Sequence, residues 1–199
     1  MSEHYFSGRP TSEPKSYRIP YVFGNRRFIF LSSTSVFSSK KIDYATDLLI
    51  RSMVVEDGDS ILDMGCGYGP IGILAAYNNQ KSQVLMVEIN ERAVSLARKN
   101  IKLNNIANAT VVKGDFFEKL EGRFDVILMN PPIAIGLRKI FEVVKTSKSY
   151  LKPSGSLQVV ARHNKGGARI KECMKEVFGN VEEISKAGGF RVYMSVFSK

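Results

Sequence analysis

The stretch that decides the fold is Ser60-Ile61-Leu62-Asp63-Met64-Gly65-Cys66-Gly67-Tyr68-Gly69-Pro70. A short apolar strand passes into a glycine-rich loop, and Pro70 suits the first turn of a following helix. Glycine allows the backbone to turn sharply and allows a ligand to lie against it. A strand, a glycine loop and a helix in this order predict a binding site for a nucleotide-type ligand.

The same alternation of strand and helix continues after this loop. Short apolar runs closed by Gly, Asp or Pro are typical of buried parallel strands. We expect such strands at residues 83–87, 110–112, 124–129 and 156–161. Two final strands, near 181–184 and 190–197, have no helical pattern between them and predict an antiparallel hairpin at the sheet edge. The fold class is therefore α/β, a Rossmann-like doubly wound sheet.

A second hairpin is expected ahead of this core. Residues 17–22 and 26–31 flank Phe23-Gly24-Asn25, where Gly and Asn tolerate the positive φ of a tight turn. We therefore predict that residues 1–38 form an N-terminal hairpin extension and that residues 39–199 form the main domain.

Composition predicts a soluble, cytoplasmic protein without metal. The chain has no run approaching the roughly 20 apolar residues of a membrane span, and its start lacks the layout of a secretory signal. With two cysteines and two histidines it cannot assemble a zinc-type cluster, and no disulfide framework is expected.

The net charge of +10 is distributed unevenly along the chain. Residues 1–42 carry 7 basic and 2 acidic residues, residues 43–131 carry 9 and 12, and residues 132–199 carry 13 and 5. Basic flanks suit a polyanionic partner such as nucleic acid, although charge alone is equally compatible with a solvated surface. The candidate phosphate contacts are Arg18, Arg26, Arg27 and Arg162.

Two cofactors compete for the glycine loop. Residues 67–72 are a literal G-x-G-x-x-G and Glu88 follows 21 residues after Gly67, as in an NAD-binding fingerprint. However, the strand closes at Asp63 and Met64, so the match begins two residues late. Asp63 would also place a carboxylate beside a pyrophosphate, whereas it could favour the ammonium of S-adenosylmethionine. The methyl donor is preferred, and capping of the loop is the alternative for Asp63.

Further candidates follow the next strands. Glu88 can accept both ribose hydroxyls, a role common to both cofactors. Asp115 can accept from the adenine amino group while Phe116 packs on the ring. For one residue of the pair Phe116 and Phe117, ordinary core packing is the expected alternative.

Asn130-Pro131-Pro132-Ile133, directly after a strand, favours methyl transfer to an amine. An exocyclic base amine is a poor nucleophile because its lone pair is delocalised into the ring. The Asn side-chain oxygen and a proline-fixed carbonyl can accept its two N–H groups and aim the nitrogen, so that catalysis comes from positioning. A plain Asn-Pro turn is the alternative.

At these motifs the chain resembles the class I methyltransferases, within them the small-domain family that includes ribosomal RNA guanine-N2 methyltransferases of the small subunit. The resemblance also covers His4-Tyr5-Phe6-Ser7, Val36-Phe37-Ser38, Lys41-Ile42-Asp43 with Thr46, and Gly188-Gly189-Phe190-Arg191-Val192. It implies a seven-stranded, mostly parallel sheet with an antiparallel last strand.

The resemblance also implies a set of functional residues. The implied S-adenosylmethionine ligands are Asp63, Gly65, Gly67, Glu88 and Asp115, with Thr46 and Phe37 covering the cofactor, and residues 130–133 presenting the target amine. Adenine-N6 and glutamine methyltransferases usually carry an aromatic residue at the position of Ile133, so guanine N2 in ribosomal RNA is preferred. A methyltransferase acting on adenine N6, protein glutamine or a small molecule, and a non-enzymatic nucleotide-binding module, remain alternatives.

Overall fold

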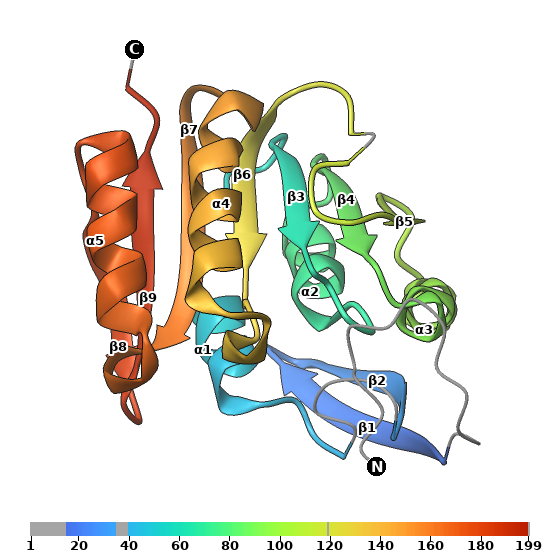
Figure 1. Ribbon diagram of the computed structural model, residues 1–199. Coiled ribbons are helices and arrows are strands. Elements are labelled where there is room, and N and C mark those ends of the chain that lie inside the picture. The colour runs from blue at the N-terminus through green and yellow to red at the C-terminus, as the bar shows by residue number, and fades with distance from the viewer. Residues whose placement is uncertain (1–14, 35–39, 119, 199) are drawn as a thin grey trace.

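Seven strands form one sheet in the computed structural model, which describes residues 15–34, 40–118 and 120–198 (Figure 1). In spatial order they are β5 (Ala109–Lys113), β4 (Gln83–Glu88), β3 (Ser60–Met64), β6 (Phe124–Met129), β7 (Leu151–Arg162), β9 (Phe190–Val196) and β8 (Glu182–Ala187). The first five run parallel, and β9 is antiparallel to both β7 and β8. The predicted mostly parallel sheet with an antiparallel last strand is confirmed.

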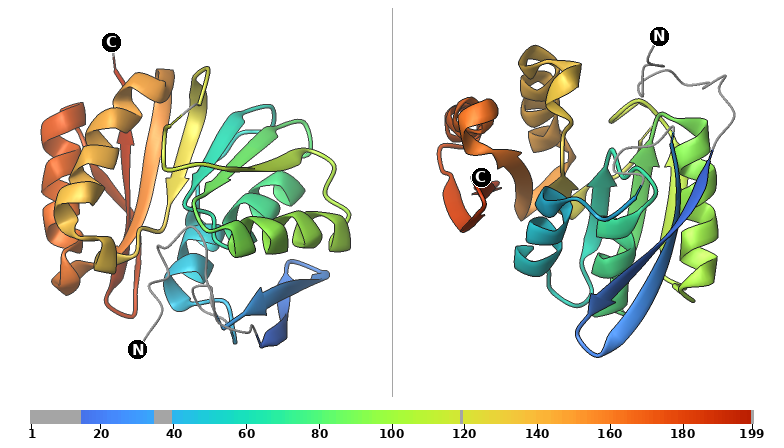
Figure 2. Two further views of the ribbon diagram at one scale, coloured as in Figure 1. Left: turned by 45° about the vertical axis from the view of Figure 1, so that its right-hand side comes forward. Right: turned by 90° about the horizontal axis from the view of Figure 1, so that it is seen from below.

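Helices cover both faces of this sheet (Figure 2). α1 (Tyr44–Ser52), α2 (Pro70–Asn78) and α3 (Glu91–Leu103) share one apolar cluster, and α4 (Leu137–Ser147) and α5 (Gly167–Phe178) share the other. Three short 3-10 segments are η1 (Ile133–Ile135), η2 (Lys148–Tyr150) and η3 (His163–Lys165). Within the described ranges no helix is long and apolar enough to cross a membrane.

Side-chain caps begin two of the helices. Asn90 caps α3, and its side chain accepts from the backbone N–H groups of Arg92 and Ala93. Asp43 caps α1 in the same way through the N–H groups of Ala45 and Thr46. α1 was not predicted, because its capping aspartate was not recognised in the sequence.

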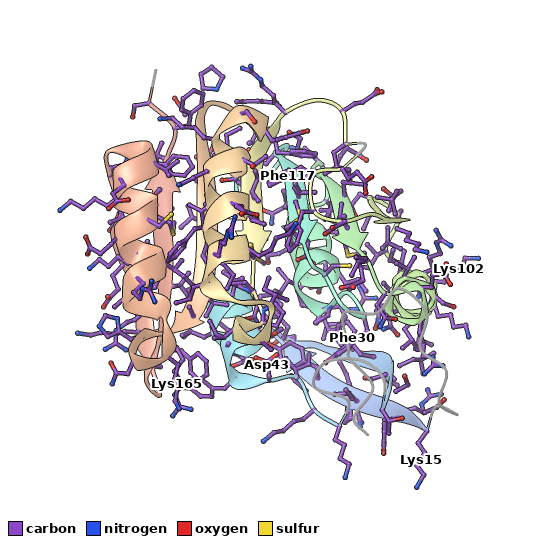
Figure 3. All side chains as sticks on the ribbon, viewed as in Figure 1. Lys15, Phe30, Asp43, Lys102, Phe117 and Lys165 are labelled. Atoms are coloured by element: carbon purple, nitrogen blue, oxygen red, sulfur yellow. The ribbon has the colours of Figure 1, made fainter. Side chains whose placement is uncertain are left out.

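The predicted N-terminal hairpin is present and packs closely on the main domain. β1 (Ser16–Phe23) pairs with β2 (Arg26–Ser33) through a two-residue turn in which Gly24 has a φ of +55°. Phe28 and Phe30 of β2 are fully buried in the same cluster as α2 and α3; Figure 3 labels Phe30 between the hairpin and the helices. The hairpin therefore contributes to the core.

Two asparagines of α3 hydrogen-bond to β2 as a neighbouring strand would. Asn100 accepts from the N–H of Leu31 at 2.7 Å and donates to its carbonyl at 3.0 Å. Asn104 makes the equivalent pair with Ile29, at 3.1 and 2.9 Å. The fully buried Asn100 also donates to the carbonyl of Tyr68 at 2.9 Å, so it links the hairpin to the glycine loop.

We expect Asn100→Ala to destabilise the protein by about 2–3 kcal/mol, because it leaves buried backbone groups of Leu31 and Tyr68 without partners. Denaturant unfolding followed by circular dichroism measures this loss. Lys99→Ala, at the neighbouring exposed position, is the control and should change stability by no more than about 0.5 kcal/mol. Equal stability of the two variants would show that these bonds do not anchor the hairpin.

Candidate active site

A cavity of about 350 Å³ opens where β3, β4, β5 and β6 reach their carboxyl ends. β4 and β5 follow β3 on one side of the sheet, whereas β6 lies on the other side of β3. The strand order therefore reverses at β3, and the cavity lies at this switch point, where open α/β sheets bind ligands. The predicted residues that line it are Thr46, Gly65, Gly67, Glu88, Asp115, Phe116, Asn130, Pro131 and Pro132. Phe37, with the motifs at residues 4–7 and 36–38, lies outside the described residues.

The glycine loop forms the floor of the cavity. Gly65, Gly67 and Gly69 have φ values of +70°, +58° and +94°, a region that L side chains rarely adopt. The N–H groups of Gly65 and Cys66 donate to the carbonyl of Val87, which ties the loop to β4. The loop is therefore held in a conformation that requires glycine and leaves its backbone open to a ligand.

Glu88 lies buried at the end of β4. Its Oε2 accepts from the N–H of Gly67 at 3.0 Å, and its Oε1 accepts from the N–H of Asn90 at 2.8 Å. Burial raises the pKa of this carboxyl, and the backbone N–H bonds oppose that rise. A carboxylate oxygen can accept more than one hydrogen bond, so Glu88 can hold the loop and still accept from ribose hydroxyls.

Asp63 lies behind the glycine loop and is not among the cavity-lining residues. Its Oδ2 accepts from the N–H of Gly72 in the first turn of α2 at 2.8 Å. Its Oδ1 is buried and has no hydrogen-bond partner among the described residues. Burial raises the pKa of Asp63 to about 7, and the neighbouring Glu88 charge adds to the rise. An interaction with the cofactor ammonium stays a prediction, and the orphaned oxygen suits an added donor.

The loop after β5 forms the opposite wall. Asp115 lies 3.9 Å from Nζ of Lys139, which also stands 5.2 Å from the centre of the Phe116 ring. Phe116 faces the cavity with an unusual φ of +50°, whereas Phe117 is buried against Tyr150, with ring centres 4.6 Å apart. Core packing therefore applies to Phe117. The sequence analysis did not predict Lys139 as a cavity residue.

Asn130 follows β6, and its side chain is oriented by α1. Its Nδ2 donates to Oγ1 of Thr46 at 2.9 Å and lies 3.5 Å from Oδ1 of Asp43. Thr46 donates its own hydroxyl proton to the Asp43 carboxylate. Since that proton is committed to an acceptor-only carboxylate, Oγ1 can only accept from Asn130, which fixes the orientation of the amide. The remaining atom, Oδ1 of Asn130, is left as an acceptor.

Asp43 is thus a site residue that the sequence analysis missed. The available signal in the sequence was Asp43 itself, because aspartate is a preferred N-cap residue. Its side chain accepts from the backbone N–H of Thr46, three residues further along. The additional contact of Asp43 with Asn130 could not be recognised from the sequence, because the two residues are 87 positions apart and only the fold brings them together.

The remaining predicted residues lie further from the cavity wall. Ile133 is 38% exposed and is not a lining residue, whereas Ile135 from the same turn lines the cavity. Arg26 bonds the carbonyl of Asn104 and packs over the rings of Phe28 and Tyr77, so it is engaged within the fold. Arg18 and Arg27 are exposed on the hairpin, and Arg162 is exposed at the end of β7. Their contact with nucleic acid, like the substrate contact of Ile133, stays a prediction.

Comparison with known proteins assigns the family. Residues 27–194 match the methyltransferase small domain. The chain belongs to this family. An uncharacterized Bacillus subtilis protein, YbxB, is 36% identical to it over 96% of this chain and 97% of its own length. The ribosomal RNA small subunit methyltransferase C of Mannheimia succiniciproducens is 31% identical over 90% of this chain.

The present chain spans about half the length of the named methyltransferase C relatives, 53% in the Mannheimia protein. A solved structure of the Thermus thermophilus 16S rRNA N2 G1207 methyltransferase, in complex with AdoMet and guanosine, superposes with a TM-score of 0.79 and 23% identity, over 95% of this chain and 52% of that one. A Pyrococcus furiosus methyltransferase superposes with a TM-score of 0.68 over 77% of this chain and 82% of that one. Membership of the small-domain methyltransferases confirms the predicted enzyme class and its S-adenosylmethionine dependence.

The cavity also fits this cofactor on chemical grounds. Glu88 and Asp115 offer acceptors for ribose and adenine, and Phe116 offers an apolar ring beside them. Glu88 holds the glycine loop through the N–H of Gly67, and Asp63 holds the first turn of α2 behind that loop. The family assignment decides against the NAD alternative. Within the described residues, no group of His, Cys, Asp and Glu could hold a metal ion.

The buried carboxyl of Asp63 should make stability depend on pH. Its folded-state pKa, about 7, lies above the ordinary value of 3.8, so the folded state retains a proton that the unfolded chain releases. The stabilisation that comes from this retained proton is complete below about pH 4 and is lost as the pH rises to 7. In this window the free energy of unfolding falls by up to about 1.4 kcal/mol per pH unit.

Unfolding free energies of wild type and Asp63→Asn, measured between pH 4 and 8, isolate this contribution. Relative to the variant, the wild type should lose stability as pH rises through this window. A difference between the two proteins that does not change with pH would contradict the buried-carboxyl assignment.

Proposed function

We propose that this protein transfers the methyl group of S-adenosylmethionine to the exocyclic N2 amine of a guanine in ribosomal RNA. The observation that carries the proposal is the fixed amide of Asn130, whose Nδ2 is held by Thr46 and whose Oδ1 is left to accept from a substrate. The names of the methyltransferase C relatives and of the Thermus structure, solved with AdoMet and guanosine, support the same substrate class.

The reaction depends on aiming a weak nucleophile. S-adenosylmethionine supplies, when bound, an electrophilic methyl group on a sulfonium. Oδ1 of Asn130 and the backbone carbonyl of Pro131 accept the two N–H groups of the amine and direct its lone pair. Such positioning can contribute several kcal/mol without a general base, and the extra proton of the methylated amine leaves to water.

The apolar part of the wall supports this chemistry by excluding water. Met64, Met129, Pro131 and Ile135 line the cavity beside Asn130. In a site with little water, the hydrogen bonds to Oδ1 of Asn130 are stronger than in solution. A guanine can reach them only when it is unstacked or single-stranded.

We expect Asn130→Ala to lower the rate of methyl transfer at least about 100-fold, the loss typical for removal of one fixed polar group that acts on the reacting atoms. Transfer is measured with radiolabelled S-adenosylmethionine and ribosomal RNA, and cofactor affinity by calorimetry. The cofactor affinity of Asn130→Ala should stay within about twofold of the wild-type value, because the proposed role of Asn130 is to bind the target amine. Asn78→Ala, at an exposed position in α2, is the matched control; wild-type turnover in Asn130→Ala would overturn the mechanism.

Thr46→Val should slow transfer roughly ten- to a hundredfold, because a freed Asn130 amide can turn its nitrogen toward the substrate. Thr46→Ser keeps the acceptor for Nδ2 and should retain most activity. The comparison uses kcat at saturating cofactor, so that any direct contact of Thr46 with the cofactor appears in KM instead. Loss of activity in Thr46→Ser, with activity retained in Thr46→Val, would argue that the methyl group of Thr46, and not its hydroxyl, matters.

Substrate identity is tested by mapping methylated nucleosides in ribosomal RNA from cells with and without the gene. Loss of N2-methylguanosine at one position supports the proposal. Loss of N6-methyladenosine would move the activity to the adenine alternative, and an unchanged RNA profile would indicate a protein or small-molecule substrate.

A further inference from the structure

Three side chains from distant parts of the sequence lie close together at one edge of the protein. The Tyr44 and Phe190 rings lie 5.8 Å apart with a tilt of 39°, and the guanidinium of Arg162 lies 5.6 Å from the centre of the Phe190 ring. We name this row of Tyr44, Phe190 and Arg162 the aromatic ledge. It joins the start of α1, the end of β7 and the start of β9, which lie at the same edge of the molecule (Figure 1).

The ledge is open to solvent although it is built of aromatic groups. Tyr44 is 51% exposed and is the one aromatic residue among the large exposed hydrophobic residues of the described chain. Arg162 is exposed and forms no ion pair with the described acidic residues. An exposed aromatic ring and a cation without an ion-pair partner among the described residues thus lie at the same edge of the protein.

The β8–β9 turn makes room for the ledge. A Cβ atom on Gly188 would lie 2.8 Å from the Tyr44 ring, and Gly188 has a φ of +54°. The carbonyl of the next residue, Gly189, accepts from the N–H of His163, which fixes the chain immediately after Arg162. The ring of Tyr44 therefore rests on the backbone of Gly188 and against the Phe190 ring, and about half of the residue, 51%, stays exposed.

Strand register places the ledge about one nucleotide from the candidate active site. Met129 of β6 pairs with Val159 of β7, and Arg162 pairs with Phe190 across β7 and β9. Asn130 thus lies level with residue 160, and Arg162 lies two residues further along the adjacent strand, about 8 Å away by standard strand spacings. On the other side, Tyr44 directly follows Asp43, which lines the cavity.

We propose that the aromatic ledge binds the RNA nucleotide adjacent to the target guanine, with its base stacked on Tyr44 and its phosphate at Arg162. This inference rests on the proposed function and extends it to a second site. Stacking on an aromatic ring accepts any base, and an arginine beside the ring adds both charge and a flat surface. Such a contact would hold the neighbouring base aside while the guanine enters the cavity.

The test measures RNA binding and methyl transfer separately. The probes are a short single-stranded oligoadenylate with one central guanosine, and the same oligonucleotide with one adenine base next to the guanosine removed. Wild type should bind the intact probe about fivefold or more tightly than the abasic one on one side of the guanosine. Tyr44→Ala should bind the intact probe about fivefold more weakly than wild type does, and should bind the abasic probe as wild type does. Tyr44→Phe should bind both probes as wild type does.

Arg162→Ala should weaken binding and reduce the slope of log Kd against log salt by about one, because it removes one phosphate contact. Arg169→Ala is the matched control, since Arg169 is likewise exposed and packs over a phenylalanine, Phe141, at 5.7 Å, but on α5 against α4. An equal loss in Arg169→Ala, unchanged binding in Tyr44→Ala, or no RNA binding by wild type would overturn the ledge.

Failure of the ledge and failure of the proposed function give different results. If Tyr44→Ala transfers methyl groups to guanine N2 with an unchanged KM for RNA, the proposed role of the ledge is wrong and the proposed function stands. Base-dependent binding through Tyr44 without any guanine-N2 transfer would do the reverse.

Discussion

The buried bond between Asp63 and the first turn of α2 is the contact on which the site depends. Oδ2 of Asp63 accepts from the N–H of Gly72 at 2.8 Å, and a Cβ on Gly72 would lie 2.4 Å from the sulfur of Met86. Strand β3, α2 and β4 can therefore approach only with glycine at this position. From the other side, Glu88 holds the N–H of Gly67. Glu88 thus fixes the glycine loop and Asp63 fixes the helix turn that follows it, and burial raises the pKa of each carboxyl.

The sequence was sufficient to predict the sheet because its central strands are apolar runs closed by turn residues. Residues 60–64 and 124–129 were predicted with the observed bounds. The strand order was not predicted, since nothing local in a strand such as β9 shows that it pairs with β7 instead of continuing at the edge. β7 also begins earlier than expected, at Leu151, where Pro153 and Gly155 mask the strand pattern.

The site was predicted where its chemistry is carried by residues at strand ends. Glu88, Asp115 and Asn130 follow three different strands, and a parallel sheet necessarily brings these ends together. Asp43, Tyr44 and Lys139 were missed because they lie at the beginnings of α1 and α4, and the placement of these helices against the sheet depends on tertiary packing. For Asp63 the motif was recognised but the position of the side chain was not. Its carboxyl lies behind the glycine loop because of the direction of the side chain, which residue spacing does not reveal.

The distribution of polar groups explains why the chain is acidic in the middle and basic at both ends. The cavity wall presents acceptors, namely Glu88, Asp115 and Oδ1 of Asn130, which suit a cofactor with hydroxyl, amino and ammonium groups and no phosphate. One cation, Lys139, lines the cavity beside Asp115, whereas the exposed Arg162 is not among the lining residues. Because carboxylates near the reacting centre would repel a phosphate, the proposed RNA substrate would keep its backbone outside the cavity and insert only a base. The proposed extrusion of a guanine is therefore a consequence of where the charges lie as much as of the size of the cavity.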